Sequence, residues 1–453
     1  LRLTCGRHHA DRRGAGVIEE IQQQSTMLRS ELVAHLSGLG RLAVVKAPPG
    51  SGKTYTLIEV LSALVAAGQR VAVAAQTNSQ ADDICVRFAA DHPEVSTARF
   101  SSKGSLPPAS FPTSVSWLTA TAELPTTPGV TVATTAKWSL TDVGFPFDLL
   151  AFDEAWQLSW AGLMQCALLS ERFLMIGDPG QIPPVVTIDV RRWETSPRAP
   201  HEAAPEIVLA EPSLVADRFV GSLPGCWRLP HEAVEFVRPF YDFDFHSFVD
   251  PGARGLDLPA GCDLADLADG RPLILTVPTP PHGPPLEVDH EVARAVAKVA
   301  AQLLTPGAQV RLGSAGDPAR PLTPTDVGVS SSHRVMNAAI ARELAVWNGE
   351  IRVDTPERWQ GLERPIMIVV HPLSGVVNPS AFDLETGRLC VMASRHQAGL
   401  VVLSRDHVGS TLADYVPNAE QAPGRPDVVG RGHDAHIRFW SSLDDQGRVR
   451  PLN

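Results

Sequence analysis

The chain has 453 residues, enough for two or three domains that each bury a core. Its composition, 44% hydrophobic and 20% charged, is ordinary for a globular protein, and no apolar run is long enough to span a membrane. The six cysteines include no C-x-x-C pair. We therefore expect a cytoplasmic protein with reduced thiols and no zinc site. The net charge of −11 argues against a protein that coats duplex DNA and confines any nucleic-acid binding to a narrow track.

In chain order, residues 1–35 are expected to form a polar helical lead-in and residues 36–205 a first domain. In that domain short apolar runs alternate with helical stretches, which is typical of a parallel sheet covered by helices on both faces. The strands are predicted at residues 71–75, 130–133, 149–152 and 173–176. The pattern predicts an α/β fold.

A phosphate-binding loop is predicted at residues 47–54, Ala-Pro-Pro-Gly-Ser-Gly-Lys-Thr, between an apolar run at 42–45 and an amphipathic helical stretch. Its glycines let backbone N–H groups close around phosphates, and the helix behind it directs its positive end at the anion. Lys53 can reach the outer phosphates and the Thr54 hydroxyl can hold Mg²⁺. The alternative is an ordinary Gly/Pro turn. The nucleotide-binding residues predicted here are Pro49, Gly50, Ser51, Gly52, Lys53, Thr54 and Tyr55.

Two later strands end in polar residues that belong at the same sheet edge. The strand at 149–152 is followed by Asp153, which would hold Mg²⁺ through water, and by Glu154, which would polarise the attacking water. The strand at 173–176 leads into Gly-Asp-Pro-Gly-Gln, in which Gln181 can contact the γ-phosphate. A structurally neutral Asp-Glu pair and a plain Asp-Pro-Gly turn are the alternatives. The order of the three motifs favours a site for ATP with Mg²⁺.

The second half alternates again after a Pro-rich linker at 191–205, and residues 206–415 are predicted to form a second domain. Its helices are expected at 287–304 and 336–347, with loops at 278–285 and 372–379. Its strands are expected at 273–277, 327–329, 366–370 and 400–403. Residues 416–453 are predicted to be a tail, with a mobile loop at 418–432 before a short helix around Trp440.

From about residue 30 to residue 405 the chain resembles the superfamily 1 helicases, specifically the DEA-x-Q branch that contains the nonsense-mediated-decay RNA helicase and many bacterial DNA helicases. Besides the motifs above, the resemblance is carried in family order by segments 75–82, 132–135, 223–230 followed by Phe240-Tyr241, 353–363 and 387–395. The segment 327–334 departs from the family, which usually has Pro-Tyr there. We also expect no accessory barrel of the kind that larger members insert before the phosphate loop.

The resemblance implies two tandem RecA-like P-loop domains with ATP in the cleft between them. Arg228 and Arg395 would act as arginine fingers on the transition-state phosphate. Glu363, in the Gly361-containing Gln-Gly-x-Glu motif, would hold the ribose or phosphate side, and Trp227 would stack on the adenine. A surface ion pair is the alternative for each arginine, and burial in a core is the alternative for the tryptophan.

The resemblance also implies contacts to a single strand of nucleic acid across the top of both domains. Caps of helices or turns are the alternative for the threonines and the asparagine, and core burial is the alternative for the tryptophan. The residues implied are Thr77, Asn78, Thr134, Thr135, His333, Thr355 and Trp359.

The sequence thus predicts an ATP-dependent helicase or translocase that moves along single-stranded DNA or RNA, with DNA favoured over RNA and 5′→3′ travel implied by the resemblance alone. A monomer without membrane contact is expected. The alternative is an ATPase switch on a helicase fold that binds nucleic acid or a partner without unwinding. A small-molecule kinase would leave Gln181, the 360–363 motif and Arg395 unexplained.

Overall fold

The computed structural model describes residues 5–186, 189–193, 195–259, 262, 264–285, 288–313, 317–417 and 427–452. The first domain is built on an eight-stranded sheet in the order β4-β3-β5-β2-β6-β7-β1-β8, in which every ladder is parallel. Its strands are β1 (Leu42–Lys46), β2 (Arg70–Ala75), β3 (Thr97–Phe100), β4 (Ser116–Leu118), β5 (Gly129–Thr134), β6 (Leu149–Phe152), β7 (Phe173–Gly177) and β8 (Arg218–Ser222). All four strands predicted for this domain are confirmed.

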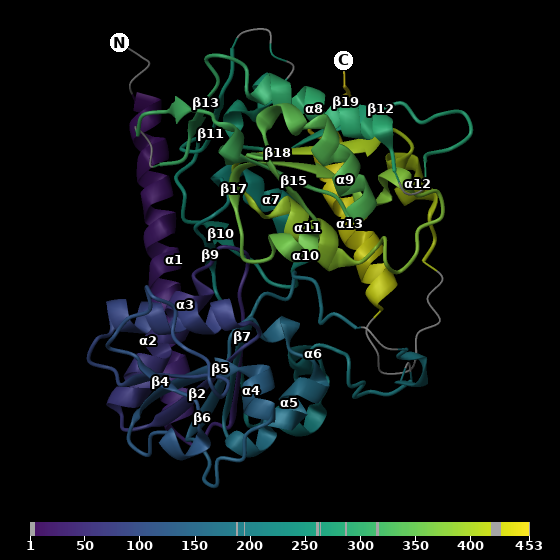
Figure 1. Ribbon diagram of the computed structural model, residues 1–453. Helices are drawn as coiled ribbons and strands as arrows, with labels where there is room; N and C mark the ends of the chain where they lie inside the picture. Colours follow the sequence, from purple (N-terminus) through teal and green to yellow (C-terminus); the bar gives the residue numbers. More distant parts are fainter. Residues whose placement is uncertain are drawn as a thin grey trace.

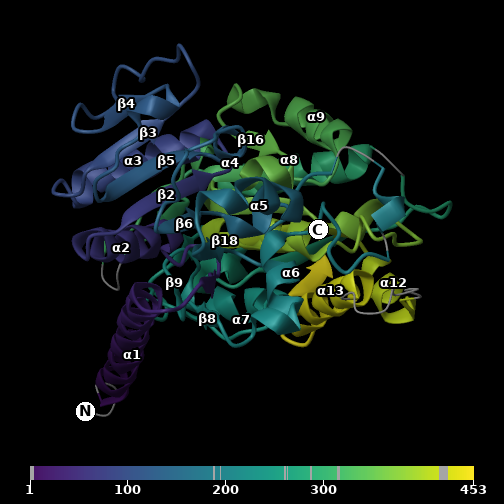
Figure 2. The same ribbon diagram turned by 90° about the horizontal axis from the view of Figure 1, so that it is seen from below.

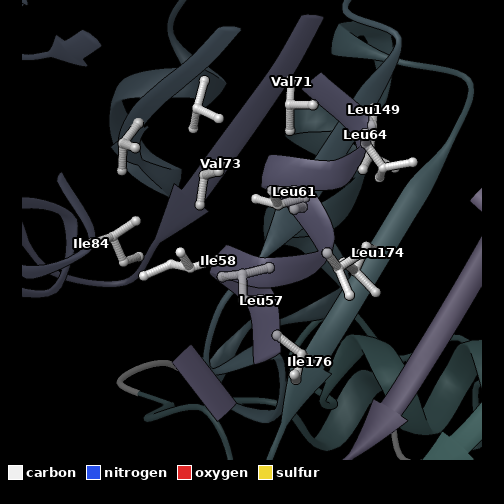
Figure 3. Packing of buried hydrophobic residues seen from close by; sticks show 14 of the residues in the cluster. Leu57, Ile58, Leu61, Leu64, Val71, Val73, Ile84, Leu149, Leu174 and Ile176 are labelled. Carbon is white, nitrogen blue, oxygen red and sulfur yellow. The ribbon is translucent and has the colours of Figure 1, made fainter. Parts of the chain in front are cut away.

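Helices cover both faces of this sheet because alternate strand residues point to opposite sides. Val71 and Val73 join the core beneath α2 and α3, which Figure 3 shows from close by. Ala72 and Ala74 join a second core that contains Trp138 of α4. The helices are α1 (Cys5–Ser37), α2 (Lys53–Ala66) and α3 (Asn78–Asp91) with the first core, and α4 (Thr135–Ser139), α5 (Trp160–Cys166) and α6 (Ala204–Ala210) with the second.

The helical lead-in predicted for residues 1–35 is confirmed from residue 5 onward as α1. Its C-terminal part packs on the first domain, with Leu28, Leu32 and Leu36 in the core beside α2. Its N-terminal part extends away from that domain, as the purple helix in Figures 1 and 2 shows. Among the helices that the structure describes, none combines the length and apolarity needed to cross a bilayer.

The second domain is a six-stranded parallel sheet in the order β16-β15-β17-β18-β12-β19. Its strands are β12 (Leu273–Val277), β15 (Val327–Ser330), β16 (Arg352–Asp354), β17 (Arg364–Val370), β18 (His396–Arg405) and β19 (Val449–Pro451). One face packs on α8 (His290–Leu303) and α9 (Arg334–Glu343). The other packs on α7 (Val234–Val237), α10 (Pro356–Trp359), α11 (Thr386–Ala393), α12 (Val408–Asp414) and α13 (Val428–Asp444). The predicted α/β class with two large parallel sheets is confirmed (Figure 1).

Short strands beside this sheet complete the second half. They are β9 (Gly225–Cys226) paired with β10 (His246–Ser247), and β11 (Gly255–Asp257) with β13 (Gln309–Arg311) and β14 (Arg320–Pro321).

Four sequence expectations need correction. The predicted boundary at residue 205 does not coincide with the end of the first sheet, because β8 pairs with β1. The segment after 416 is more than a tail, since β19 pairs with β12 and closes an edge of the second sheet. The loop predicted at 418–432 is wrong for residues 428–432, which begin the 17-residue helix α13 rather than a short one; residues 418–426 lie outside the described residues. The helix predicted at 287–304 is observed as α8, which begins at His290; residue 287 lies outside the described residues.

Candidate active site between the two sheets

The three phosphate-site motifs follow strands that lie side by side. The phosphate loop follows β1, Asp153 follows β6, and Gln181 follows β7, and these strands are consecutive in the order β6-β7-β1. Because parallel strands end at a common edge, the side chains that follow them converge there. Sheet order therefore brings together residues that are far apart in sequence.

The loop itself has the backbone that a phosphate cradle needs. Gly50 and Gly52 have φ angles of 66° and 80°, in the left-handed region that glycine adopts without strain. Gly52 is the N-cap of α2 and supplies no side chain to the amides of the first turn, so these amides are available to bind an anion. Ser51 is buried with a hydroxyl oxygen that has no hydrogen-bond partner.

Lys53 and the carboxylates meet above the loop. The Lys53 Nζ lies 3.4 Å from Glu154 Oε1, and both side chains are largely buried. Glu154 has φ 51°, an uncommon conformation for a residue with a side chain. Such strain is typical of functional sites, where the surrounding fold holds a side chain in one orientation.

The donor set beside Lys53 suits a divalent cation such as Mg²⁺. Asp153 is 5% exposed and accepts hydrogen bonds from Thr54 Oγ1 at 3.4 Å and from the Glu154 N–H at 2.9 Å. Burial, and after it the Glu154 charge, raises the pKa of the Asp153 carboxyl, although Lys53 opposes this. A carboxylate and a hydroxyl, with water and phosphate oxygens as further ligands, make up the usual magnesium site of such loops.

Gln181 links the carboxylates to the next strand end. Its amide nitrogen lies 3.3 Å from Glu154 Oε2 and 3.4 Å from Asp178 Oδ2, while its oxygen accepts from Gln157 Nε2 at 2.9 Å. The side chain is 5% exposed, so these contacts fix its orientation. The structure therefore places Gln181 directly beside Glu154.

Arg228 reaches this site from the other side. The Trp227 N–H donates to the Gly50 carbonyl at 2.8 Å, and a Cβ on Gly50 would lie 2.4 Å from the Arg228 Cβ. The Arg228 guanidinium is largely buried, pairs with Glu363 at 2.5 Å and donates to the Ser394 carbonyl at 3.3 Å. Arg228 is therefore in contact with the phosphate loop and is no surface ion pair.

Arg395 is the second cation at this seam. It is 2% exposed, and its Nε and Nη2 have no hydrogen-bond partner. Burial, and after it the charge of Arg228, lowers the pKa of the Arg395 guanidinium, whereas Asp178 opposes the shift. Two neighbouring buried cations, one with unused donors, are costly unless an anion joins them.

The remaining predicted nucleotide contacts lie around these groups. Gly361 has φ 76° in the turn that leads to Glu363, whose second carboxylate oxygen accepts from Gln397 at 2.7 Å. Trp227 is 50% exposed and stacks on Phe248, with ring centroids 4.2 Å apart. Tyr55 is half exposed on the first turn of α2. The indole of Trp227 thus keeps one face open next to the phosphate loop.

The predicted nucleic-acid contacts follow neighbouring strands as well. Thr77 and Asn78 follow β2 and Thr134 and Thr135 lie at the end of β5, and these strands are adjacent. In the second sheet, His333 follows β15 and Thr355 follows β16, which are also adjacent. Each pair therefore lies at the carboxyl edge of its own sheet.

Several of these side chains also have local structural partners. Thr77 accepts from the Gln80 N–H as the cap of α3, and Thr134 accepts from the Lys137 N–H as the cap of α4. The capping alternative therefore describes both. Asn78 accepts from Arg99, Thr135 donates to the Ala75 carbonyl, and His333 stacks on Phe382.

Trp359 has to be removed from the nucleic-acid contacts. It is fully buried in the core of the second domain, and its indole N–H donates to the Val329 carbonyl at 3.0 Å. A ring enclosed in this way has no face open for a base. The core alternative is the correct one for this tryptophan.

Sequence reasoning assigned no role to three polar residues that lie at the seam. Asp178 accepts from Tyr241, and Gln397 donates to Glu363. Asp178 lies inside the Gly-Asp-Pro-Gly-Gln segment, Tyr241 becomes a candidate through its contact across the two halves, and Gln397 through a contact within the second half.

These elements define a P-loop nucleotide-binding domain that faces a second parallel α/β domain. In agreement, the AAA domain family matches residues 24–192, which include the phosphate loop, both carboxylates and Gln181. Among curated proteins, the DNA replication ATP-dependent helicase/nuclease DNA2 of Saccharomyces cerevisiae is 28% identical over 158 residues, 33% of this chain and 10% of that protein. The match therefore spans only a tenth of that relative's length.

Solved helicase structures are similar at a low level. The PRRSV helicase has 15% identity and a TM-score of 0.42, over 84% of this chain and 56% of that one. The arterivirus nonstructural protein 10 helicase in complex with DNA has 14% identity and a TM-score of 0.42, over 85% of this chain and 66% of that one. The DUF1998 helicase MrfA bound to DNA and AMPPNP has 10% identity and a TM-score of 0.43, over 90% of this chain and 54% of that one. Similarity at this level carries no conclusion about this chain.

Proposed function

We propose that this chain hydrolyses ATP at the seam between its two domains and uses the cycle to move along single-stranded nucleic acid as a helicase or translocase of superfamily 1. The observation that carries the proposal is the juxtaposition at the seam. The phosphate loop with Lys53 and Glu154 comes from the first domain, and the loop touches the backbone of Arg228, while Arg395 is buried nearby with unused donors.

In this proposal the triphosphate lies on the first turn of α2, where Lys53 neutralises the outer phosphates. Thr54 and Asp153 would hold Mg²⁺, which supplies positive charge to the phosphate oxygens. Glu154 orients and polarises the attacking water, with Gln181 fixing the carboxylate. Arg228 and Arg395 stabilise the negative charge that develops on the transferred phosphoryl group.

Arg228 has to exchange partners for this role. Its guanidinium is held by Glu363, so that ATP binding transfers the arginine from a carboxylate to a phosphate. Glu363 is then free to contact the ribose or phosphate side. Trp227 offers its open face to the adenine, a stacking contact that is favourable for any base but fits a purine best.

The nucleic acid is proposed to cross the carboxyl edges of both sheets. Thr77, Asn78, Thr134 and Thr135 would contact its backbone from the first domain, and His333 and Thr355 from the second. Closure on ATP and opening after hydrolysis would change the distance between the two sets and move the strand. DNA is the proposed strand and 5′→3′ the proposed direction, the latter from family resemblance alone.

A second candidate is an ATPase switch that binds nucleic acid or a partner without unwinding. The acidic balance of the chain, with a net charge of −11, favours it. It shares the hydrolytic site and differs in what hydrolysis drives.

The test is steady-state ATPase activity with and without single-stranded DNA and RNA oligonucleotides, followed by strand displacement on duplexes with 5′ or 3′ overhangs. The motor predicts a large stimulation that falls with rising salt, because phosphate contacts weaken as counterions compete. Basal turnover that no strand stimulates would support the switch. An absence of turnover with every strand would overturn the hydrolytic site itself.

A further inference from the structure

A tyrosine to which the sequence assigned no role joins the two domains at the seam. The ring of Tyr241 lies edge-on to Phe243 and Phe245 of the second domain, at centroid distances of 5.4 and 5.3 Å. Its hydroxyl crosses to the first domain and donates to Asp178 Oδ1 at 2.9 Å. Beside it, Asp242 forms an ion pair with Lys46 of β1. This segment is therefore held against the first sheet at two points.

The direction of the hydrogen bonds follows from the protons available. Tyr241 also lies 3.3 Å from Cys390 Sγ. Burial raises the pKa of the Tyr241 hydroxyl and of the Cys390 thiol, so both groups keep their protons. Because the phenol has one proton and gives it to Asp178, the thiol donates to the phenol oxygen. Cys390, Tyr241 and Asp178 form a chain that runs from α11 into the first domain.

The chain continues to the carboxylate proposed to act on water. Asp178, 1% exposed, accepts from the Gly180 N–H at 2.9 Å and lies 3.4 Å from the Gln181 amide nitrogen. The same Gln181 nitrogen lies 3.3 Å from Glu154 Oε2. Asp178 thus fixes the turn that carries Gln181, and Gln181 contacts Glu154.

The close approach of the tyrosine is built into the turn. A Cβ on Gly180 would lie 2.5 Å from the Tyr241 hydroxyl oxygen and 2.8 Å from Cys390 Sγ. Distances under 3.0 Å are not tolerated by real Cβ atoms without a shift of the neighbours. Any larger residue at position 180 would therefore displace the hydroxyl from Asp178.

We propose that Tyr241 is a positioning residue which makes the orientation of Glu154 depend on closure of the seam. Its hydroxyl orients Asp178, which holds Gln181, which holds Glu154. When the second domain moves away, the hydroxyl leaves Asp178 and the chain of contacts ends. This inference rests on the proposed ATP hydrolysis and adds the link by which the second domain controls it.

The first measurement is kcat and KM for ATP in Tyr241→Phe. A buried hydrogen bond is worth enough that kcat should fall about tenfold, while KM for ATP stays within about twofold, because the tyrosine does not contact the proposed nucleotide position. Tyr415→Phe is the matched control, since it removes a hydroxyl from the same domain beside His433. A changed KM with an unchanged kcat would contradict the inference.

A double-mutant cycle with Asp178→Asn separates positioning from general damage. If Tyr241 acts through Asp178, the double variant has the kcat of Asp178→Asn alone, whereas independent effects multiply. Thermal unfolding and binding of a fluorescent ATP analogue verify that each variant is folded. Multiplicative losses, or a Tyr241→Phe variant with wild-type kcat, would overturn the inference and leave the proposed function intact. A wild-type chain without turnover would overturn both.

Discussion

The two domains contribute to the seam in different ways. The groups of the first domain follow β1, β6 and β7, which are adjacent in one sheet, so its phosphate site is assembled within that domain. Arg228 and Arg395 of the second half belong to segments far apart in sequence: Arg228 lies against Gly50 of the phosphate loop, and Arg395 interacts with Arg228 and Asp178. We therefore expect the first domain to bind the nucleotide and the second domain to complete the site for hydrolysis.

This difference predicts that removing an arginine of the second domain lowers turnover while the first domain still binds nucleotide. Arg395→Ala should lower kcat by about 10³-fold or more, because an arginine that stabilises the transition-state charge has an effect of that size. Binding of a fluorescent ATP analogue should remain within a few-fold of the wild type. Both are measured on the same preparation.

Arg342→Ala is the control for that variant, since Arg342 is an exposed arginine near the end of α9. Arg395→Lys separates charge from geometry, because lysine keeps the charge and loses the planar fork. Recovery of turnover by lysine to the wild-type rate would show that Arg395 contributes only charge, against the proposed finger.

In the first domain, removing the proposed general base should lower turnover and leave nucleotide binding unchanged. Glu154→Gln should lower kcat by about 10²- to 10⁴-fold, the usual contribution of a general base, and should preserve nucleotide binding. Glu171→Gln, an exposed acid just before β7, is the matched control. A Glu154→Gln variant with wild-type turnover would remove the assigned role of this carboxylate.

The smallest expected difference between the domains is in their response to acid. In the second domain, burial lowers the pKa of His396 and of His436 to about 3. In the first domain, burial alone would lower the pKa of His92, but hydrogen bonds to Glu59 and Glu94 raise it. The two sets of histidines therefore shift the free energy of unfolding in opposite directions.

Between pH 6.5 and 3, His396 and His436 bind protons in the unfolded chain but not in the folded one. Their contribution to the free energy of unfolding is therefore full above pH 6.5 and is lost as the pH falls. At pH 5 the loss is about 2 kcal/mol for each histidine. His92, whose folded pKa is raised, instead stabilises below its unfolded pKa and loses this as pH rises. Calorimetry from pH 7 to pH 5 should therefore show the second domain losing stability relative to the first.

The control compares two substitutions in the second half. His436→Leu should flatten the fall in melting temperature below pH 6.5, because it removes one buried titrating group. His282→Leu, at an exposed position, should leave the pH dependence unchanged. Equal slopes for His436→Leu and the wild type would contradict the assigned burial.

Two tryptophans show what pattern can and cannot supply. Trp227 and Trp359 both lie in segments that resemble nucleotide- or strand-binding motifs. One is 50% exposed beside the phosphate loop, and the other is fully buried beneath β15. An indole is large, apolar and able to donate one hydrogen bond in either setting, so its type does not reveal which face of the fold it occupies.

The sequence by itself determined the parallel α/β class, the large-sheet strands that it predicted and the phosphate loop, because alternation of apolar runs and a short glycine-rich turn are local properties. It did not determine that β8 joins the first sheet or that β19 closes the second, since pairing between distant strands leaves little local signal. Nor did it reveal the role of Tyr241. Its hydroxyl acquires a partner only when the turn after β7 and the second domain come within hydrogen-bonding distance, which is a consequence of tertiary contact alone.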